Sequence, residues 1–227
     1  MKKIALLISL FAFVATANAQ IVGKYSKPEE TYTMDANGRV VKKERRGLFD
    51  RNKTEKVIDQ KYLVGACPEV NGKVQWDKAI DVPGKNAKQI YDSMLIFLKA
   101  FSKSNGMTER SNVAVVNETD HEIGASLQEY LVFERKPLSL DQAKFSYQLV
   151  VRCYDGRCTL SMRNMSYTYE EDRGGGSFPA EDMISDAEAL NKAKTGFQKG
   201  GVRKFRTKTI DRKDQVFKTI EDYITGK

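Results

Sequence analysis

The sequence predicts an α+β domain built on an antiparallel β-sheet with helices packed on one face. The first observation is a β-hairpin at residues 143–169, where large apolar side chains alternate with mostly polar ones on both sides of Asp155-Gly156. The second is an amphipathic helix pattern at residues 86–101, whose apolar stripe suits the apolar face of a sheet. A two-stranded ribbon is not stable alone, so we expect more strands and a helical cover.

The central hairpin has a predictable register. Asp-Gly favours a two-residue type I′ turn, which opposes Cys153 with Cys158. Beyond Met162 the large residues change phase, so we expect one extra residue, a β-bulge, near residues 163–164. The facing cysteines can form a cross-strand disulfide in an oxidising compartment or remain small buried hydrophobes, and both alternatives stay open.

The first 19 residues have the three parts of a secretory signal peptide. Lys2-Lys3 precedes an apolar run that ends at Val14, and Ala17-Asn18-Ala19 follows as a cleavage site. We therefore expect export to the periplasm, the cell surface or the medium, without a transmembrane anchor, because the apolar run is too short to span a bilayer. Residues 20–60 are predicted to be a poorly structured basic leader.

Removing Lys2 and Lys3 leaves 36 basic and 30 acidic residues, a net charge of +6. This charge favours an anionic partner such as lipopolysaccharide or an acidic glycan. An ordinary solvated basic surface without a specific partner has the same net charge.

The remaining elements follow in order along the chain. Asn71-Gly72 predicts a second hairpin, whose register opposes Cys67 with Trp76 and Leu63 with Ile80, and we interpret the single tryptophan as a core anchor. The helix at residues 86–101 begins with a capping box formed by Asn86 and Gln89. A short strand follows at residues 113–117, and the next strand, at residues 123–133, is interrupted on its apolar side by Glu129. Residues 170–180 are a Gly-rich connection, and residues 181–227 are a helical segment.

Three phrases of this sequence resemble a known family. Residues 62–73 (YLVGACPEVNGK), 81–91 (DVPGKNAKQIY) and 209–217 (TIDRKDQVF) are similar to bacterial secreted proteins known as a domain of unknown function with a TATA-box-binding-protein-like fold, frequent in Gram-negative gut bacteria. The resemblance implies a curved antiparallel sheet with helices on one face for residues 61–169. It brings no catalytic or binding residues to this chain.

The sequence contains little that predicts catalysis. His121 is the only histidine and lies in a charged turn, and the cysteines lack paired Cys-x-x-Cys spacing, so no catalytic residue, metal site or cofactor is predicted. Asp120 and Glu122 flank the histidine and leave a hydrolase with paired carboxylates as one alternative. Nucleic-acid binding, suggested by the fold analogy alone, is a second alternative, which export disfavours because it removes the usual partner.

The hypothesis we favour is a non-enzymatic exported module that binds an envelope component, a peptide or an anionic glycan through an open sheet face or an edge strand. Arginine forks and lysines suit phosphate and carboxylate groups. The same positions on a one-sided sheet can also be plain polar surface. The candidate ligand-binding residues come from the polar side of the hairpin and from a basic C-terminal segment: Lys144, Gln148, Arg152, Arg157, Arg163, Arg203, Lys204 and Arg206.

Overall fold

The computed structural model describes residues 31–34, 40–43, 58–170, 175–198 and 201–227. The predicted signal peptide and the turn expected at residues 35–38 lie outside these ranges. The chain divides into two compact units, residues 1–56 and 57–227. In the first unit β1 (Thr31–Met34) pairs antiparallel with β2 (Val40–Lys43), so the leader predicted to be poorly structured contains two paired strands.

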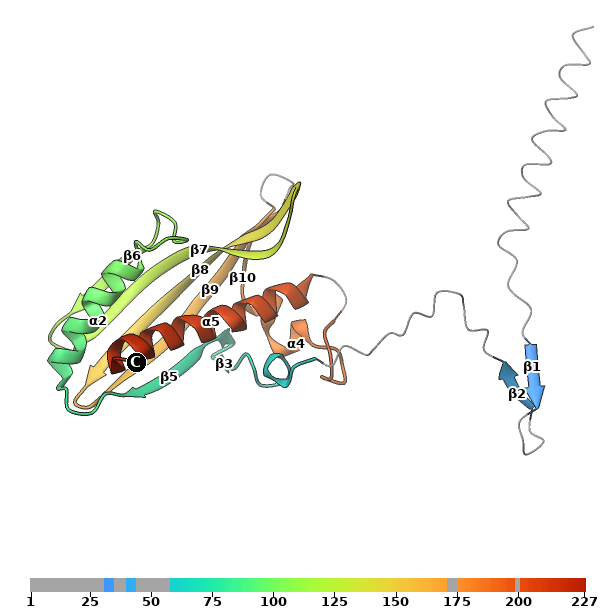
Figure 1. Ribbon diagram of the computed structural model, residues 1–227, viewed down its shortest axis with the longest axis horizontal. Helices are drawn as coiled ribbons and strands as arrows, with labels where there is room; N and C mark the ends of the chain where they lie inside the picture. The colour runs from blue at the N-terminus through green and yellow to red at the C-terminus, as the bar shows by residue number, and fades with distance from the viewer. Residues whose placement is uncertain (1–30, 35–39, 44–57, 171–174, 199–200) are drawn as a thin grey trace, which may run out of the picture. The chain divides into compact units, whose positions relative to one another are not determined.

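The second unit is organised around a six-stranded antiparallel sheet (Figure 1). Strands β6 to β9 lie side by side in chain order, whereas β5 and β10 both pair with the outer edge of β9. Strand β5 pairs with the first half of β9, and β10 pairs with the second half. The strands are β5 (Trp76–Asp81), β6 (Asn112–Asn117), β7 (Glu122–Lys136), β8 (Ser139–Tyr154), β9 (Arg157–Tyr169) and β10 (Gly176–Pro179).

The predicted register of the central hairpin is confirmed. Cys153 opposes Cys158, and an extra residue in β9 shifts the ladder at the predicted place, where Asn164 has a φ of 51°. The predicted type I′ turn is wrong, because Gly156 has a positive φ of 73° but Asp155 does not. The Asp155 carboxylate instead accepts a hydrogen bond from the Ala87 N–H at 2.8 Å, which holds this turn against the start of a helix.

The second hairpin is shorter than predicted. Strands β3 (Glu69–Val70) and β4 (Lys73–Val74) flank Asn71-Gly72, and both turn residues have the positive φ of a type I′ turn. Leu63 does not oppose Ile80, because β5 pairs with β9 and the short 3₁₀ helix η1 (Gln60–Tyr62) precedes Leu63. Trp76 is buried and donates to the Ala66 carbonyl at 2.8 Å, so the predicted core anchor is confirmed.

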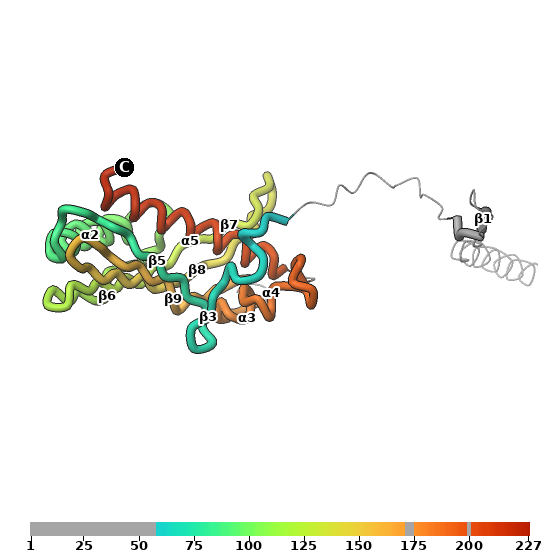
Figure 2. The backbone as a smooth tube through the Cα atoms, turned by 90° about the horizontal axis from the view of Figure 1, so that it is seen from below, coloured from blue at the N-terminus to red at the C-terminus, as the bar shows by residue number. Residues whose placement is uncertain are grey.

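Two long helices lie across one face of the sheet (Figure 1). The turned view shows α5 (Val202–Thr225) running along one side of the strands (Figure 2). The other long helix, α2 (Ala87–Phe101), begins with the predicted capping box of Asn86 and Gln89. The short helices α3 (Glu181–Ile184) and α4 (Asp186–Ala189) contact α5.

Side chains from the sheet, α2 and α5 form one apolar core. The predicted C-terminal helical segment is thus packed on the same core as the strands. Within the described ranges no helix is long and apolar enough to cross a bilayer.

Candidate binding surface

The face of the sheet opposite α2 and α5 is called the open face here. Successive side chains of a strand point to opposite faces, and in β8 the odd-numbered residues from Ala143 to Cys153 are buried under the helices. The even-numbered residues therefore belong to the open face. Five predicted ligand-binding residues lie there: Lys144, Gln148, Arg152, Arg157 and Arg163.

A hollow of about 250 Å³, the central hollow, lies in the middle of the open face. Its side chains are mainly amides and hydroxyls. Gln128 Nε2 donates to Ser146 Oγ at 2.9 Å, and Asn164 Nδ2 donates to Gln148 Oε1 at 2.7 Å. The polar lining residues are Arg110, Ser126, Gln128, Ser146, Gln148 and Asn164.

Hydrogen bonds within the central hollow fix its amides but leave some groups unused. No described residue bonds to the Gln148 Nε2 or to the Asn164 Oδ1. One donor and one acceptor are therefore available side by side, which is what a ligand with hydroxyl or amide groups requires.

The arginines of the open face differ in their pairing. Arg152 donates from Nε to Glu122 Oε2 at 2.6 Å, so its charge is neutralised. The Arg157 guanidinium lies 5.6 Å from the centre of the Tyr154 ring. Arg163 has a buried Nε with no partner among the described residues. Of the predicted arginines on this face, Arg157 and Arg163 therefore carry charge that no described carboxylate neutralises.

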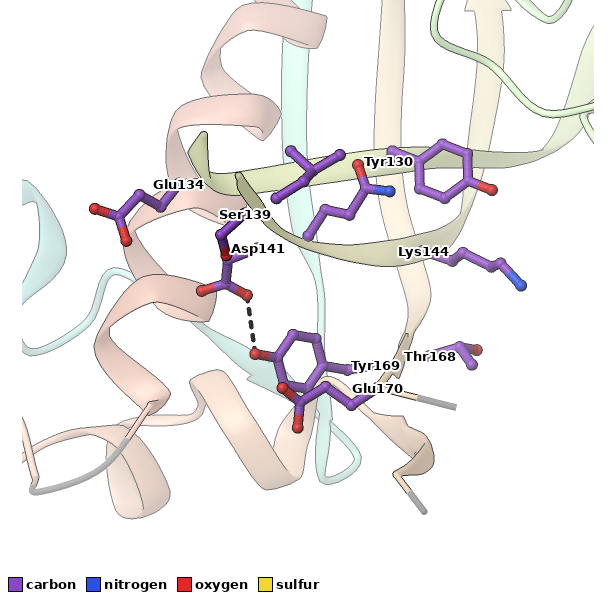
Figure 3. Close-up of a pocket in the computed structure, with 10 residues that line it drawn as sticks. Tyr130, Glu134, Ser139, Asp141, Lys144, Thr168, Tyr169 and Glu170 are labelled. Carbon is purple, nitrogen blue, oxygen red and sulfur yellow. Dashed lines mark hydrogen bonds between the residues drawn. The ribbon is translucent and has the colours of Figure 1, made fainter. Parts of the chain in front are cut away.

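A larger hollow of about 680 Å³, the edge hollow, lies where β9 ends beside β8 (Figure 3). Because it lies at a strand edge, side chains from both faces of the sheet line it. Figure 3 shows Tyr130 and Lys144 on one side and Asp141 on the other. The lining residues are Tyr130, Glu134, Ser139, Leu140, Asp141, Gln142, Lys144, Thr168, Tyr169 and Glu170.

Lys204, a predicted ligand-binding residue, supports the wall of the edge hollow. Its Nζ donates to Asp141 Oδ2 at 2.8 Å and to the Tyr169 hydroxyl at 2.7 Å, and it lies 4.8 Å from the centre of the Phe133 ring. Burial alone would raise the pKa of Asp141, but the hydrogen bonds from Lys204 and Tyr169 bring that pKa below its usual value. The ammonium of Lys204 is thus used within the protein.

The prediction that Arg206 binds a ligand is wrong. Its side chain is fully buried. Like the buried Phe205 before it, Arg206 lies on the face of α5 that packs against the rest of the domain. Its three guanidinium nitrogens donate to four acceptors: the carbonyl oxygens of Tyr62, Leu63 and Ile184 and the carboxylate of Asp186. Arg203, in contrast, is exposed on the same helix and lies outside the open face.

The two carboxylates proposed for a hydrolase have different partners. Asp120 accepts a hydrogen bond from Asn117 Nδ2 at 2.7 Å, whereas Glu122 pairs with Arg152. Neither residue lines the central hollow or the edge hollow. The His121 ring packs edge-on against Tyr91, with ring centres 5.7 Å apart. In the described part of the chain no group of three or more His, Cys, Asp or Glu side chains could hold a metal ion.

The three cysteines are buried free thiols, so the alternative of a Cys153–Cys158 disulfide is not realised in the structure. Burial raises the pKa of Cys67 and Cys153 to about 12 and that of Cys158 to about 11. Such thiols are poor nucleophiles and poor metal ligands at neutral pH.

The sequence interpretation missed several residues of these hollows. Gln128, Ser146 and Tyr130 occupy polar positions of predicted strands, so the alternation pattern could have identified them. Arg110 lies in a loop, and nothing in its local sequence indicates that it reaches the sheet. Asn164 was predicted only as part of the bulge.

Comparison with known proteins gives a family but no activity. Residues 76–168 match the family described as a domain of unknown function (DUF4468) with TBP-like fold. No curated protein matches the chain.

Two crystal structures are similar to this protein. A DUF4468 family protein from Bacteroides ovatus is 36% identical, with a TM-score of 0.68 over 74% of this chain and 95% of its own. A TBP-like protein from Parabacteroides distasonis shares the fold at 20% identity, with a TM-score of 0.55 over 70% of this chain and 96% of its own. The sheet with helices on one face, as implied by the resemblance, is thereby confirmed, and the chain belongs to the DUF4468 family with its TBP-like fold.

Proposed function

We propose that this protein is an exported, non-enzymatic module that binds an acidic glycan of the cell envelope on its open face. The observation that carries the proposal is the central hollow, where amide and hydroxyl groups from three neighbouring strands are held in place by their own hydrogen bonds. Groups fixed before binding lose little conformational freedom when a ligand arrives.

The chemistry of the central hollow suits a sugar. Sugar hydroxyls both donate and accept, and the available Gln148 Nε2 and Asn164 Oδ1 can meet one of each kind. Arg110 on the rim of the hollow adds a fork for a carboxylate, sulfate or phosphate substituent.

The distribution of charge across the open face limits where an acidic substituent can bind. At its β5 edge the face carries Asp77 and Asp81, which lie opposite Ser161 and Arg157. Arg157 can offset only one of these two carboxylates, so the side next to Arg110 is the more favourable one for an acidic substituent. The signal-peptide pattern of residues 1–19 supports an envelope location for this encounter.

The test is a binding assay with defined polymers on the mature protein. Polygalacturonate, chondroitin sulfate, lipopolysaccharide, neutral dextran and duplex DNA are titrated by calorimetry. We expect at least one of the three acidic glycans or glycolipids to bind, dextran to bind weakly, and Gln148→Ala and Arg110→Gln to weaken binding about tenfold each, the effect of one or two lost hydrogen bonds.

The matched control is Arg203→Gln, which removes the same charge from α5 outside the open face and is expected to change the affinity less than twofold. Equal losses for Arg203→Gln and Arg110→Gln contradict a site in the central hollow and indicate unspecific charge attraction. Binding only to duplex DNA, with a steep dependence on salt, contradicts the proposal and favours nucleic acid.

A further inference from the structure

Arg163 lies on the open face without a partner. It stands opposite Gln148 in the β8–β9 ladder, at the β9 side of the central hollow. Its Nε is buried, and no described residue forms a hydrogen bond or an ion pair with its guanidinium. The hydroxyl of Ser161, two residues earlier on the same face, is also buried without a partner, in a residue that is 8% exposed. Buried polar groups in folded proteins nearly always have a partner, so this part of β9 has unmet hydrogen-bonding capacity.

Arg110 lies at the other end of the central hollow. The Thr108 N–H donates to the Gln128 carbonyl at 2.7 Å, and Ser111 Oγ donates to the same oxygen at 3.0 Å. These bonds place residues 108–111 alongside β7, on the side away from β8. No described carboxylate pairs with Arg110. The hollow therefore runs across the strands, with an unneutralised arginine at each end.

The two arginines are separated by the width of three strand spacings. Neighbouring strands lie about 4.8 Å apart, so the segment with Arg110 is roughly 14 Å from β9. Side chains stand nearly perpendicular to a sheet, which keeps the two guanidinium groups at opposite ends of the hollow. The hydrogen-bonded pairs Gln128–Ser146 and Gln148–Asn164 lie between them. A single acidic group is therefore too small to meet both arginines in this arrangement.

We propose that the ligand of the open face is a polysaccharide with acidic groups on successive or alternate sugars, which crosses β7, β8 and β9. One acidic group binds Arg110, another binds Arg163, and the sugar hydroxyls between them meet Gln148 and Asn164. This inference rests on the proposed function and adds a second point of attachment to it. Two linked contacts bind more tightly than either alone, because the second forms at a high effective concentration once the first is made.

An acidic residue near Arg163 limits the attraction without removing it. Asp77 lies opposite Ser161, and both of its carboxylate oxygens accept hydrogen bonds from Gln75 Nε2, at 3.0 and 2.9 Å. Diagonal neighbours in a sheet lie about 7–8 Å apart, so Asp77 is near Arg163 but forms no ion pair with it. Asp77→Asn is therefore expected to strengthen binding of the polysaccharide about twofold to threefold.

The probes are two series of acidic oligosaccharides of defined length, titrated by calorimetry against the mature protein. Oligogalacturonates of one to eight sugars carry carboxylates, and chondroitin sulfate oligosaccharides of two to eight sugars carry carboxylates and sulfates. We expect the affinity for at least one series to rise at least tenfold from its shortest to its longest member. Arg163→Gln and Arg110→Gln should each remove this rise and change the affinity for the shortest member less than about threefold, because one arginine remains for it.

Arg157→Gln is the matched control. Arg157 lies on the same strand and the same face, six residues or roughly 20 Å before Arg163. Its substitution removes the same charge and should preserve the rise in affinity with length. Arg163→Lys keeps the charge but loses the fork, so its affinity for the longest member should fall between wild type and Arg163→Gln. Thermal unfolding of each variant checks that the domain stays folded.

Three outcomes overturn the inference. The first is an affinity that does not depend on length, or a rise that Arg163→Gln retains, since either result shows a single point of attachment. The second is equal loss for Arg157→Gln and Arg163→Gln, which indicates diffuse attraction by charge. The third is binding of lipopolysaccharide with no binding of either series, which excludes a polysaccharide of this kind and leaves the proposed function standing. If no acidic glycan or glycolipid binds, the proposed function and this inference are both wrong.

Discussion

Arg212 on α5 and Glu129 on β7 form a two-pronged ion pair inside the interface between helix and sheet, with Arg212 Nε 2.9 Å from Glu129 Oε1 and Nη2 2.8 Å from Oε2. The Tyr147 hydroxyl donates to the same carboxylate at 3.0 Å. This pair explains why an acidic residue interrupts the apolar side of a core strand. Burial and the nearby Glu129 carboxylate raise the pKa of Tyr147, which therefore remains a donor.

Arg212→Met is expected to lower the free energy of unfolding by about 3–5 kcal/mol, because it leaves the buried Glu129 carboxylate without its cation. The double variant Glu129→Gln with Arg212→Met should recover most of that loss, since no charge then stays buried alone and the Tyr147 hydroxyl keeps an acceptor. Urea unfolding, monitored by Trp76 fluorescence, measures the free energy of unfolding of the single and the double variant. Lys218→Met, which breaks an exposed pair with Asp222, is the control and should cost less than about 1 kcal/mol. A double variant as unstable as Arg212→Met would contradict the ion-pair explanation.

Arg206→Lys is expected to destabilise the domain by about 3 kcal/mol, because a single ammonium cannot reach four acceptors arranged around a guanidinium. Arg203→Lys, three residues earlier and exposed, should leave stability within about 0.5 kcal/mol of the wild type. Thermal or urea unfolding of the two variants and the wild type measures these differences in stability. Equal midpoints would show that the buried network contributes nothing.

The stabilisation by Asp141 and Lys204 is expected to depend on pH at both extremes. The pKa of Asp141 is lowered from 3.8, so its stabilising effect is complete above that value and is lost as pH falls through the lower folded-state pKa. The pKa of Lys204 is raised from 10.5, so its effect is present below that value and is lost as pH rises through the higher folded-state pKa.

The measurement compares Asp141→Asn with the wild type in urea across the pH range. The stability difference should be constant between about pH 5 and pH 9 and should shrink toward both ends. A difference that changes most near neutral pH would contradict the assignment, because neither group titrates there.

The thiols of Cys67, Cys153 and Cys158 are expected to be unreactive in the folded protein. With pKa values of about 11 to 12, less than about one thiol in a thousand is ionised at pH 8. Iodoacetamide should leave the native mass unchanged. In denaturant without reductant it should add three groups, and addition of only one group would show that Cys153 and Cys158 are joined.

Local signals in the sequence predicted most of the central fold. The hairpin register, the bulge at Asn164 and the capping box of Asn86 and Gln89 are confirmed, because each depends on residues within a few positions of one another. The pairing predicted between Leu63 and Ile80 is wrong because the true partner of this strand lies far away in the sequence. Strand β5 finds its partner in β9, about 80 residues away, and no turn signal encodes such a pairing.

The candidate binding surface was predicted in part. Alternation in β8 placed Lys144, Gln148 and Arg152 on the open face, but it could not show that Arg152 is neutralised by Glu122. Arg206 was misassigned because a cluster of basic residues on a helix does not reveal which of them turns inward. The edge hollow had no sequence signal, since it depends on where one strand ends relative to its neighbour.

The shared outer edge of β9 implies an order of folding. The two-residue turn at Asp155-Gly156 closes at once, whereas β5 must return across the long chain between Asp81 and Arg157. Closing the longer loop costs more chain entropy, so β5 joins late and relies on β8 and β9 being paired already. We therefore expect the hairpin to form first and β5 to pair with it afterwards. A slow step in refolding should change the fluorescence of Trp76 as this residue becomes buried.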